Sequence, residues 1–478
     1  MSKRPLFLGI ILVAVLACAA AFYYVFSGGN SDKSRQDINK IEAFTLSNGM
    51  QVIVAPNHRV PAVSHIIWLS VGATDDPAGK SGLAHYLEHL MFKGTSQVPE
   101  GEYSKRIERI GGNQNAFTGP DFTGYYVNVA KEHLEEVMRL ESDRFQHLQP
   151  SLEQSLKERD VIVEERRMRI ENSPPALLFE QVNATLFQHH PYRIPIIGWA
   201  HEMKKLEPSD AMMFYHEYYH PGNMTLVVAG DVTAAELKPL AEQYYGSIPA
   251  KEPIRHRWLE EPPLRAEKMV ILRSAQQKQM IWSRHYIAPN LVYGETSHAL
   301  PLMLLEQWLG GGKTSLLYQS LVEKQKIAVN VSVEYSPLAR GPSQFIIYVM
   351  PADGVTPERI AQAVDDSLKI ATDTLINSER LNRVKTLLKA DVIYAQDGLQ
   401  AVGQFVGYLS ALGVSLDYYT NWVSYVESVT AEQIQQAAEA VLIKSQSVTA
   451  HLIPEAGASA AATNAGVPFT GYDNVQVH

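Results

Sequence analysis

The five residues from His85 to His89, which read His-Tyr-Leu-Glu-His, constrain this chain more than any other stretch. On a helix, residues three and four positions apart share one face, so His85, Glu88 and His89 would all point to the same side. Two imidazoles, a third protein ligand and one open position make up a catalytic zinc site. The motif therefore predicts a metal-binding helix, with Glu88 as the general base that takes a proton from the attacking water. The alternative is a helix whose histidines only satisfy local hydrogen bonds.

A second charged segment contains a candidate for the third ligand. Residues 151–171 are typical of an amphipathic helix, which the Asn-Ser-Pro-Pro sequence at 172–175 would end. Glu158 and Glu165 lie two helical turns apart on it and therefore on one face. We predict Glu165 as the third metal ligand, and Glu158 as a catalytic neighbour that orients a ligand or the water. Taken alone, a Glu-rich helix is more often a solvated surface.

The residues around both segments resemble the inverted-zinc metallopeptidases, the family of pitrilysin, insulin-degrading enzyme and the mitochondrial processing peptidase. The matching runs are residues 72–77, 82–95, 111–118, 121–125, 190–192, 218–224 and 227–232. The resemblance places the third ligand of that family on Glu165 and its neighbouring Glu on Glu158. It implies a short, two-domain, bacterial-type zinc endopeptidase, which holds one Zn²⁺ per chain and hydrolyses peptides or unfolded segments.

By the same resemblance the fold is α+β, with two similar units that form half of a clamshell chamber. Each unit would be an antiparallel sheet packed with helices, and the chain length suits more than one domain. We expect a basic N-terminus at 1–4, a membrane anchor or signal segment at 5–26, a tether at 27–40, a zinc-bearing peptidase domain at 41–250, a linker at 251–264, a metal-free homologous domain at 265–452 and a flexible tail at 453–478. The linker is rich in proline and charge, as domain boundaries often are.

Asn115, Ala116, Phe117 and Thr118 correspond, by resemblance, to the strand whose edge the substrate peptide joins in extended form. Such strand addition draws its affinity from main-chain hydrogen bonds, so it selects for an extended chain more than for a sequence. An ordinary strand start is the alternative interpretation.

Two positions in the second half depart from the family. Its single-chain members carry an Arg and a Tyr that bind the substrate carbonyl, and the corresponding residues here are Val322 and Val329. Neither valine can donate a hydrogen bond to a developing oxyanion. We therefore expect a metal-free homologous subunit to supply the pair in a hetero-oligomer, with a homodimer as the alternative. Because metal-free relatives of the processing peptidase act as assembly subunits, a non-catalytic scaffold or peptide-binding subunit is the alternative function.

The segment from His216 to His220 also fits a zinc motif, H-E-x-x-H. Pro221 follows directly and disfavours helical geometry at the residue before it. No third ligand follows at helical spacing, so we interpret the segment as a helix end that leads into a strand at 225–228.

The N-terminus predicts the location of the protein. Residues 5–26 carry no charge and are long enough to span a bilayer as a helix, after a short basic start. We expect a single-span anchor with the catalytic part exported, on the periplasmic side of the inner membrane in a bacterium. The small residues at 17–21 leave a cleaved signal and a soluble periplasmic protein as the alternative, and a lipid on Cys18 as a third option. A net charge of −9 without a basic stripe argues against nucleic acid as a partner.

Overall fold

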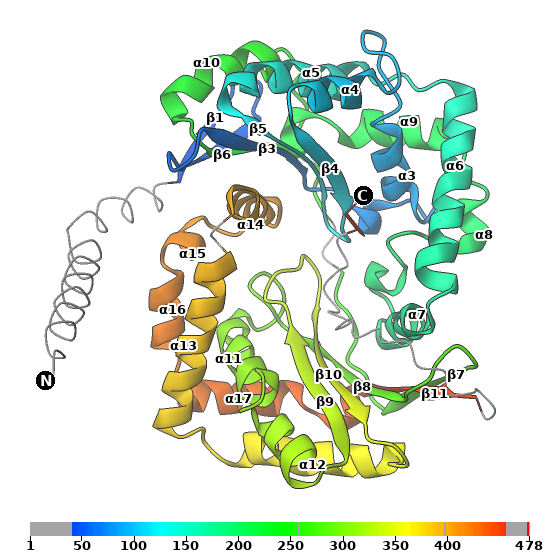
Figure 1. The fold of residues 1–478 in the computed structure, drawn as a ribbon, viewed down its shortest axis with the longest axis vertical. Coiled ribbons are helices and arrows are strands. Elements are labelled where there is room, and N and C mark those ends of the chain that lie inside the picture. Colours follow the sequence, from blue (N-terminus) through cyan, green and yellow to red (C-terminus); the bar gives the residue numbers. More distant parts are fainter. Residues whose placement is uncertain (1–40, 257–258, 396–397, 456–475, 478) are drawn as a thin grey trace, which may run out of the picture.

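The computed structural model describes residues 41–256, 259–395, 398–455 and 476–477. Two sheets lie at opposite ends of the molecule, each with its own helices (Figure 1). The elements of the first half are β1 (Glu42–Thr45), β2 (Gln51–Pro56), β3 (Ala62–Leu69), η1 (Ala73–Asp75), α3 (Leu83–Leu90), α4 (Glu102–Arg109), β4 (Asn113–Thr118), β5 (Thr123–Ala130), η2 (Lys131–His133), α5 (Leu134–His147), α6 (Leu152–Arg166), η3 (Arg167–Glu171), α7 (Pro174–Leu186), η4 (Pro191–Arg193), α8 (Ala200–Met203), α9 (Pro208–Tyr218), η5 (Pro221–Asn223), β6 (Met224–Gly230) and α10 (Ala234–Tyr245).

The second half is built in the same style and ends on a short strand. Its elements are β7 (Lys268–Ser274), β8 (Ile281–Ala288), η6 (Thr296–His298), α11 (Ala299–Gly310), η7 (Tyr318–Lys324), β9 (Ala328–Tyr335), β10 (Ser343–Pro351), α12 (Pro357–Asp373), α13 (Ser378–Ala395), α14 (Leu399–Ala411), α15 (Asp417–Thr420), α16 (Trp422–Ser428), α17 (Ala431–Val441), η8 (Lys444–Gln446), β11 (Ser447–Pro454) and β12 (Gln476–Val477).

The two sheets share one connection order. The first runs β1-β2-β6-β3-β5-β4-β12 and the second β7-β11-β8-β10-β9. From β2 and from β7 onward, the strands of each unit therefore lie in the order first, fifth, second, fourth, third along the chain. The internal repeat that the family resemblance implied is thus present in the topology, and the prediction of two units packed with helices is confirmed.

The prediction that both sheets are antiparallel is wrong in one respect. β2 pairs with β6 in parallel and β7 pairs with β11 in parallel, so each sheet is mixed. In each unit the last strand returns after a long crossover and inserts between the first two strands. A long crossover permits parallel pairing, whereas a tight hairpin imposes antiparallel pairing. The alternating patterns of single strands do not record where a distant strand inserts.

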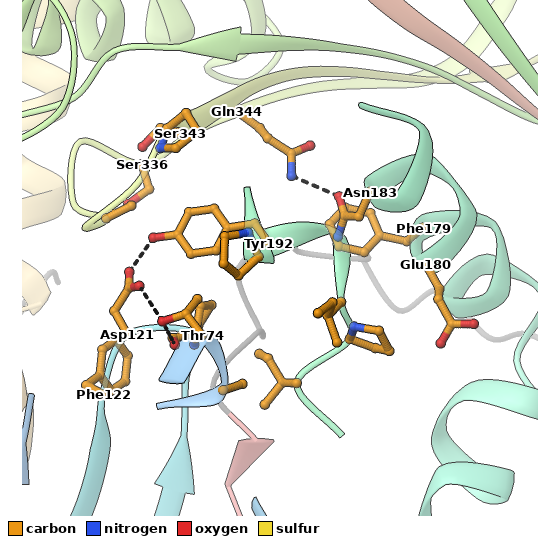
Figure 2. A pocket seen from close by; sticks show the side chains of 18 of the residues that line it. Thr74, Asp121, Phe122, Phe179, Glu180, Asn183, Tyr192, Ser336, Ser343 and Gln344 are labelled. Atoms are coloured by element: carbon orange, nitrogen blue, oxygen red, sulfur yellow. Dashed lines mark hydrogen bonds between the residues drawn. The ribbon is translucent and has the colours of Figure 1, made fainter. Parts of the chain in front are cut away.

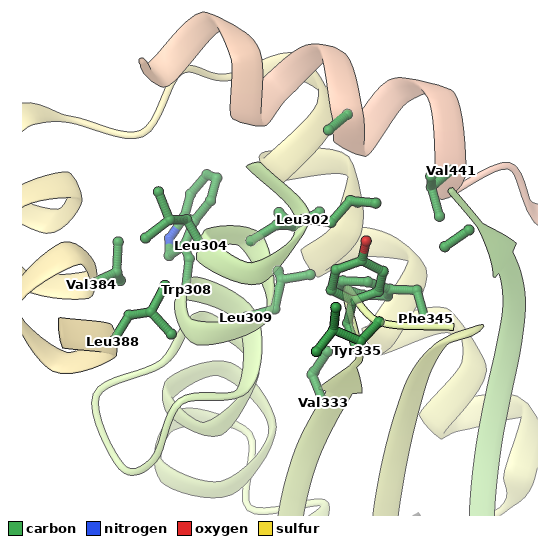
Figure 3. Close-up of a cluster of buried hydrophobic side chains, with 14 of the residues drawn as sticks. Leu302, Leu304, Trp308, Leu309, Val333, Tyr335, Phe345, Val384, Leu388 and Val441 are labelled. Atoms are coloured by element: carbon green, nitrogen blue, oxygen red, sulfur yellow. The ribbon is translucent and has the colours of Figure 1, made fainter. Parts of the chain in front are cut away.

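Each unit gives one helix to the other. Helix α14, from the second half, lies against β3 and β6 of the first sheet, and α7, from the first half, lies against β7 and β11 of the second (Figure 1). Gly407 allows the close approach of α14, because a Cβ there would lie 2.0 Å from Nε1 of Trp68. The apolar face of α14 joins that of the first sheet to the core around α11, where Leu302, Trp308 and Phe345 pack (Figure 3). The two halves therefore form one interlocked body.

The predicted membrane anchoring needs correction. In the part of the chain that the structure describes, no helix is both long and apolar enough to cross a membrane. A span needs about 20 predominantly apolar residues, and the longest described helix, α13, has 18 residues with charged side chains distributed along it. The prediction of a single-span anchor is wrong by this finding. The predicted segment, residues 5–26, lies outside the described residues, as do the tether at 27–40 and most of the predicted tail.

Gly407→Ala should destabilise the whole chain, because the new methyl group would collide with Trp68 at the contact that joins the halves. Overpacking of this kind typically costs about 1–3 kcal/mol in the free energy of unfolding. Denaturant titration measures this free energy of unfolding. Gly398→Ala, at the start of the same helix, is the matched control, since its Cβ would meet only the Ala401 Cβ at 3.7 Å. Equal stability of the two variants would contradict the tight packing of α14.

Candidate metal centre

The N-terminus of helix α3 is capped by Gly82 and by the side chain of Asp76. Gly82 has a positive φ of 86°, and a Cβ there would lie 2.5 Å from the carbonyl oxygen of Ile197, so glycine is required by both conformation and space. The carboxylate of Asp76 accepts hydrogen bonds from the backbone N–H groups of Gly82, Leu83 and Ala84 at 2.7, 3.2 and 2.8 Å. Burial raises the pKa of Asp76 well above its usual range, and these three bonds oppose the rise. The cap holds the first turn of α3 in place.

Helix α3 brings two histidines to Glu165 of α6. Nε2 of His85 lies 3.6 Å, and Nε2 of His89 3.4 Å, from Oε2 of Glu165, and the candidate ligand atoms all lie within 4.8 Å of one another. Ligands bound about 2.0–2.1 Å from a tetrahedral zinc ion are about 3.3 Å apart, so these separations fit such an ion. His85 and Glu165 are buried and His89 is partly exposed. Among the described residues, this is the group of three that could hold a metal ion.

A chain of charges orients His89. Its Nδ1 lies 2.8 Å from Oε1 of Glu158, whose Oε2 accepts a hydrogen bond from Nζ of Lys93 at 2.6 Å. Burial would raise the pKa of Glu158, but the hydrogen bonds from His89 and Lys93 outweigh burial and lower it. Glu158 thus leaves Nε2 of His89 facing Glu165, which is how a carboxylate outside the ligand set fixes a metal-binding imidazole.

Two basic residues at this centre were not singled out from the sequence. Lys93 reaches Glu158, and Nε of Arg169 lies 2.8 Å from Oε1 of Glu165. Each follows a predicted site residue by four positions, since Lys93 follows His89 and Arg169 follows Glu165. That spacing is the signal that could have found them.

Glu88 lies beside the cluster with Thr118 as its partner. The hydroxyl of Thr118, the last residue of β4, donates a hydrogen bond to Oε2 of Glu88. Burial raises the pKa of Glu88 to about 8, opposed by His89 and by this hydrogen bond. A cation held by the neighbouring histidines would favour the charged form of the carboxylate. The arrangement places a candidate base at the end of the strand predicted to bind substrate.

That strand contributes its backbone more than its side chains. Ala116, Phe117 and Thr118 are buried, and Phe117 packs its ring edge-on against Trp68. Oδ1 of Asn115 accepts a hydrogen bond from the N–H of Ala116 at 2.8 Å. On its inner side β4 pairs with β5 over its whole length. The other edge of β4 is therefore the part that can meet an extended chain.

The structure gives Val322 and Val329 no polar role. Val322 lies in η7, packed against the core of the second unit, and Val329 is exposed on β9.

The H-E-x-x-H segment at 216–220 ends a helix, as expected. α9 ends at Tyr218, and His220 has an extended backbone before η5.

A cavity of about 610 Å³ opens between the two units beside this centre (Figure 2). Arg169, which contacts Glu165, is part of its wall. Asp121 accepts a hydrogen bond from the hydroxyl of Tyr192, and Nε2 of Gln344 donates one to Oδ1 of Asn183 at 2.9 Å. The first bond lies within the first unit, whereas the second joins α7 to β10 of the second unit, so a hydrogen bond crosses between the units at the cavity wall.

Comparison with known proteins agrees with this architecture. Residues 51–199 match the family described as Insulinase (Peptidase family M16), and residues 205–388 match the Peptidase M16 inactive domain. The chain is 28% identical over 385 residues to the zinc protease PqqE of Helicobacter pylori, covering 80% of this chain and 86% of the relative. The crystal structure of a protease from Helicobacter pylori superposes with a TM-score of 0.80 at 26% identity, covering 87% of this chain and 100% of that one. Pitrilysin shares the fold with a TM-score of 0.73 at 18% identity, covering 87% of this chain but 45% of that longer chain.

Two sheets of one topology, with two His and a Glu brought together between α3 and α6, agree with the zinc-protease class to which the named relatives belong. The chain belongs to the peptidase M16 (insulinase) family and is of its short, two-domain bacterial type.

Glu158→Gln should weaken zinc binding by about 10–100-fold, because it removes the charge that orients His89. Competition with a chromophoric chelator measures the affinity. Glu153→Gln is the matched control, since Glu153 lies on the same helix but is exposed and pairs with Lys157. Loss of affinity in both variants would contradict a specific role for Glu158.

Zinc binding should release protons at pH 7. Burial would lower the pKa of His89, but hydrogen bonds with Glu158 and Glu165 raise it to about 9 in the metal-free chain. Below that pH the imidazole is protonated and a metal must displace the proton, so the apparent affinity should rise as the pH rises toward 9. Calorimetry in two buffers of different ionisation enthalpy measures the proton release. The same heat in both buffers would contradict it.

Proposed function

We propose that this protein is a zinc-dependent endopeptidase that hydrolyses peptides or unfolded segments. His85, His89 and Glu165 would hold one zinc ion, with Glu88 as the catalytic base and Glu158 as the residue that positions His89. The observation that carries the proposal is the convergence of these side chains beside the last residue of β4, the strand whose outer edge can pair with an extended segment. The name of its relative, a zinc protease, supports the same class of reaction.

The residues of the chain would divide the reaction between them. A bound zinc ion supplies a Lewis acid that polarises the scissile carbonyl and makes the attacking water more acidic. Glu88 would take the proton from that water and pass it to the leaving amine. Thr118 would hold the carboxylate of Glu88 in position, and Arg169 that of Glu165. The edge of β4 would align the peptide through main-chain hydrogen bonds, which suits unfolded substrates of varied sequence.

We also propose that a second, metal-free homologous subunit completes the site. Val322 and Val329 offer no hydrogen-bond donor where related single-chain enzymes carry an Arg and a Tyr. Loss of one oxyanion donor typically costs about 10²–10³ in rate, so the chain alone would be a weak enzyme. The chain also matches under half the length of pitrilysin, in which a single polypeptide has room for two such halves.

Glu88→Gln should keep its zinc and lose turnover by at least about 10²-fold, because the amide cannot take the proton from the water. Hydrolysis of a long, unstructured, internally quenched peptide measures turnover, and metal analysis measures zinc. Glu164→Gln, an exposed neighbour of Glu165, is the control that should change neither. Turnover that survives in Glu88→Gln would contradict the assigned base.

The same assay separates the enzyme from the alternative, a non-catalytic scaffold. Glu88-dependent turnover that rises about 10²-fold or more when the metal-free homologue is added would support the paired enzyme. Full activity of the chain alone would contradict the need for a partner. Zinc-loaded protein that stays inactive with its partner, yet still assembles with it, would favour the scaffold.

A further inference from the structure

The edge of β4 is occupied by the protein's own C-terminal strand. β12 pairs with β4 in antiparallel register, with Gln476 opposite Thr118 and Val477 opposite Phe117. Figure 1 shows this end of the chain beside β4 and α3, far along the sequence from both. Because β5 takes the other edge of β4, β12 lies on the edge that remains for any added strand.

The paired position is next to the candidate catalytic base. Thr118, opposite Gln476, also donates the hydrogen bond to Glu88. An extended peptide that joined β4 beside Glu88 would need the same main-chain groups that β12 uses. One strand edge accepts one partner strand at a time, so β12 and such a peptide exclude each other.

We infer that the C-terminal strand is a built-in competitor, which occupies the substrate edge of β4 and has to leave before an extended peptide can bind there. The pairing of β12 with β4 is observed in the structure and does not depend on any assigned function. Its effect on turnover rests on the proposed peptidase function.

The connection to the rest of the chain permits this exchange. β11 ends at Pro454 and β12 begins at Gln476, and this length of chain could reach at most about 76 Å when extended, at up to 3.6 Å per residue. A tethered segment competes at an effective concentration in the millimolar range. Among the described residues the pairing covers two residues of β4, so the contact is small.

Peptide binding tests the competition without any catalysis. A fluorescent peptide with the sequence of residues 469–478 would be titrated into the full-length chain carrying Glu88→Gln, and fluorescence anisotropy would report its affinity. Gln476→Pro with Val477→Pro removes the backbone donors of β12, whereas Gln476→Ala with Val477→Ala keeps them. The proline pair should bind the peptide about tenfold more tightly than the parent, and the alanine pair should bind it like the parent. Equal affinity of all three would overturn the inference.

Hydrogen exchange shows which residues of β4 are covered by β12. The amides of Ala116, Phe117 and Thr118 should include positions that exchange faster in the proline pair than in the alanine pair, because β12 no longer covers them. Unchanged exchange along β4 would also overturn the inference. With Glu88 restored, the proline pair should show a KM about tenfold lower and an unchanged kcat on an unstructured peptide. A protein that stays inactive even with the metal-free homologue added would contradict the proposed function, while the binding and exchange results would still decide whether β12 occupies the edge.

Discussion

The burial of α3 is the constraint on which the rest of the site depends. Most of its residues are buried, including His85 and Glu88, between the sheet edge at β4 and the helices α6 and α9. Buried polar groups are costly unless they are matched, so each polar side chain of α3 has a defined neighbour. Glu165 faces both histidines, Thr118 holds Glu88, and Glu158 with Lys93 holds His89. This matching fixes how the side chains of the centre are oriented, and the Asp76 cap fixes the start of the helix.

The exchange of α7 and α14 joins the two units into one scaffold. α7 follows shortly after η3, the element that carries Arg169. Because α7 packs on the second sheet, the helix that carries Glu165 is connected to the second unit. α14 covers the face of the first sheet opposite α3, close to Trp68 and Phe122. The cavity between the units lies among these elements, which explains why its wall draws on both halves.

The second unit has the same topology, but the group of metal-binding side chains found among the described residues lies in the first unit. Helix α11 of the second unit occupies the place in the chain order that α3 holds in the first unit, and its residues are almost entirely apolar. Leu302, Leu305 and Leu309 pack in the core there. An apolar helix in the second unit stabilises the fold, whereas α3 gives up apolar contacts to hold a polar cluster. In this repeat the helix of the second unit contributes to the core, and the corresponding helix of the first unit carries the candidate catalytic residues. The proposed partner subunit would supply the hydrogen-bond donors that Val322 and Val329 lack.

The sequence by itself determined the local part of this protein. The spacing of His85, Glu88 and His89 places them on one face of a helix wherever that helix lies, because the period of the helix is intrinsic. The spacing of Glu158 and Glu165 did the same for α6, and the choice of Glu165 rested on resemblance to a family. Tertiary structure alone decided the parallel insertion of β6 and β11, the exchange of α7 and α14, the bond from Thr118 to Glu88, and the pairing of β12 with β4. Each of these joins segments far apart in the chain, and no local pattern of residues specifies which distant strand or helix will fill an open edge or face.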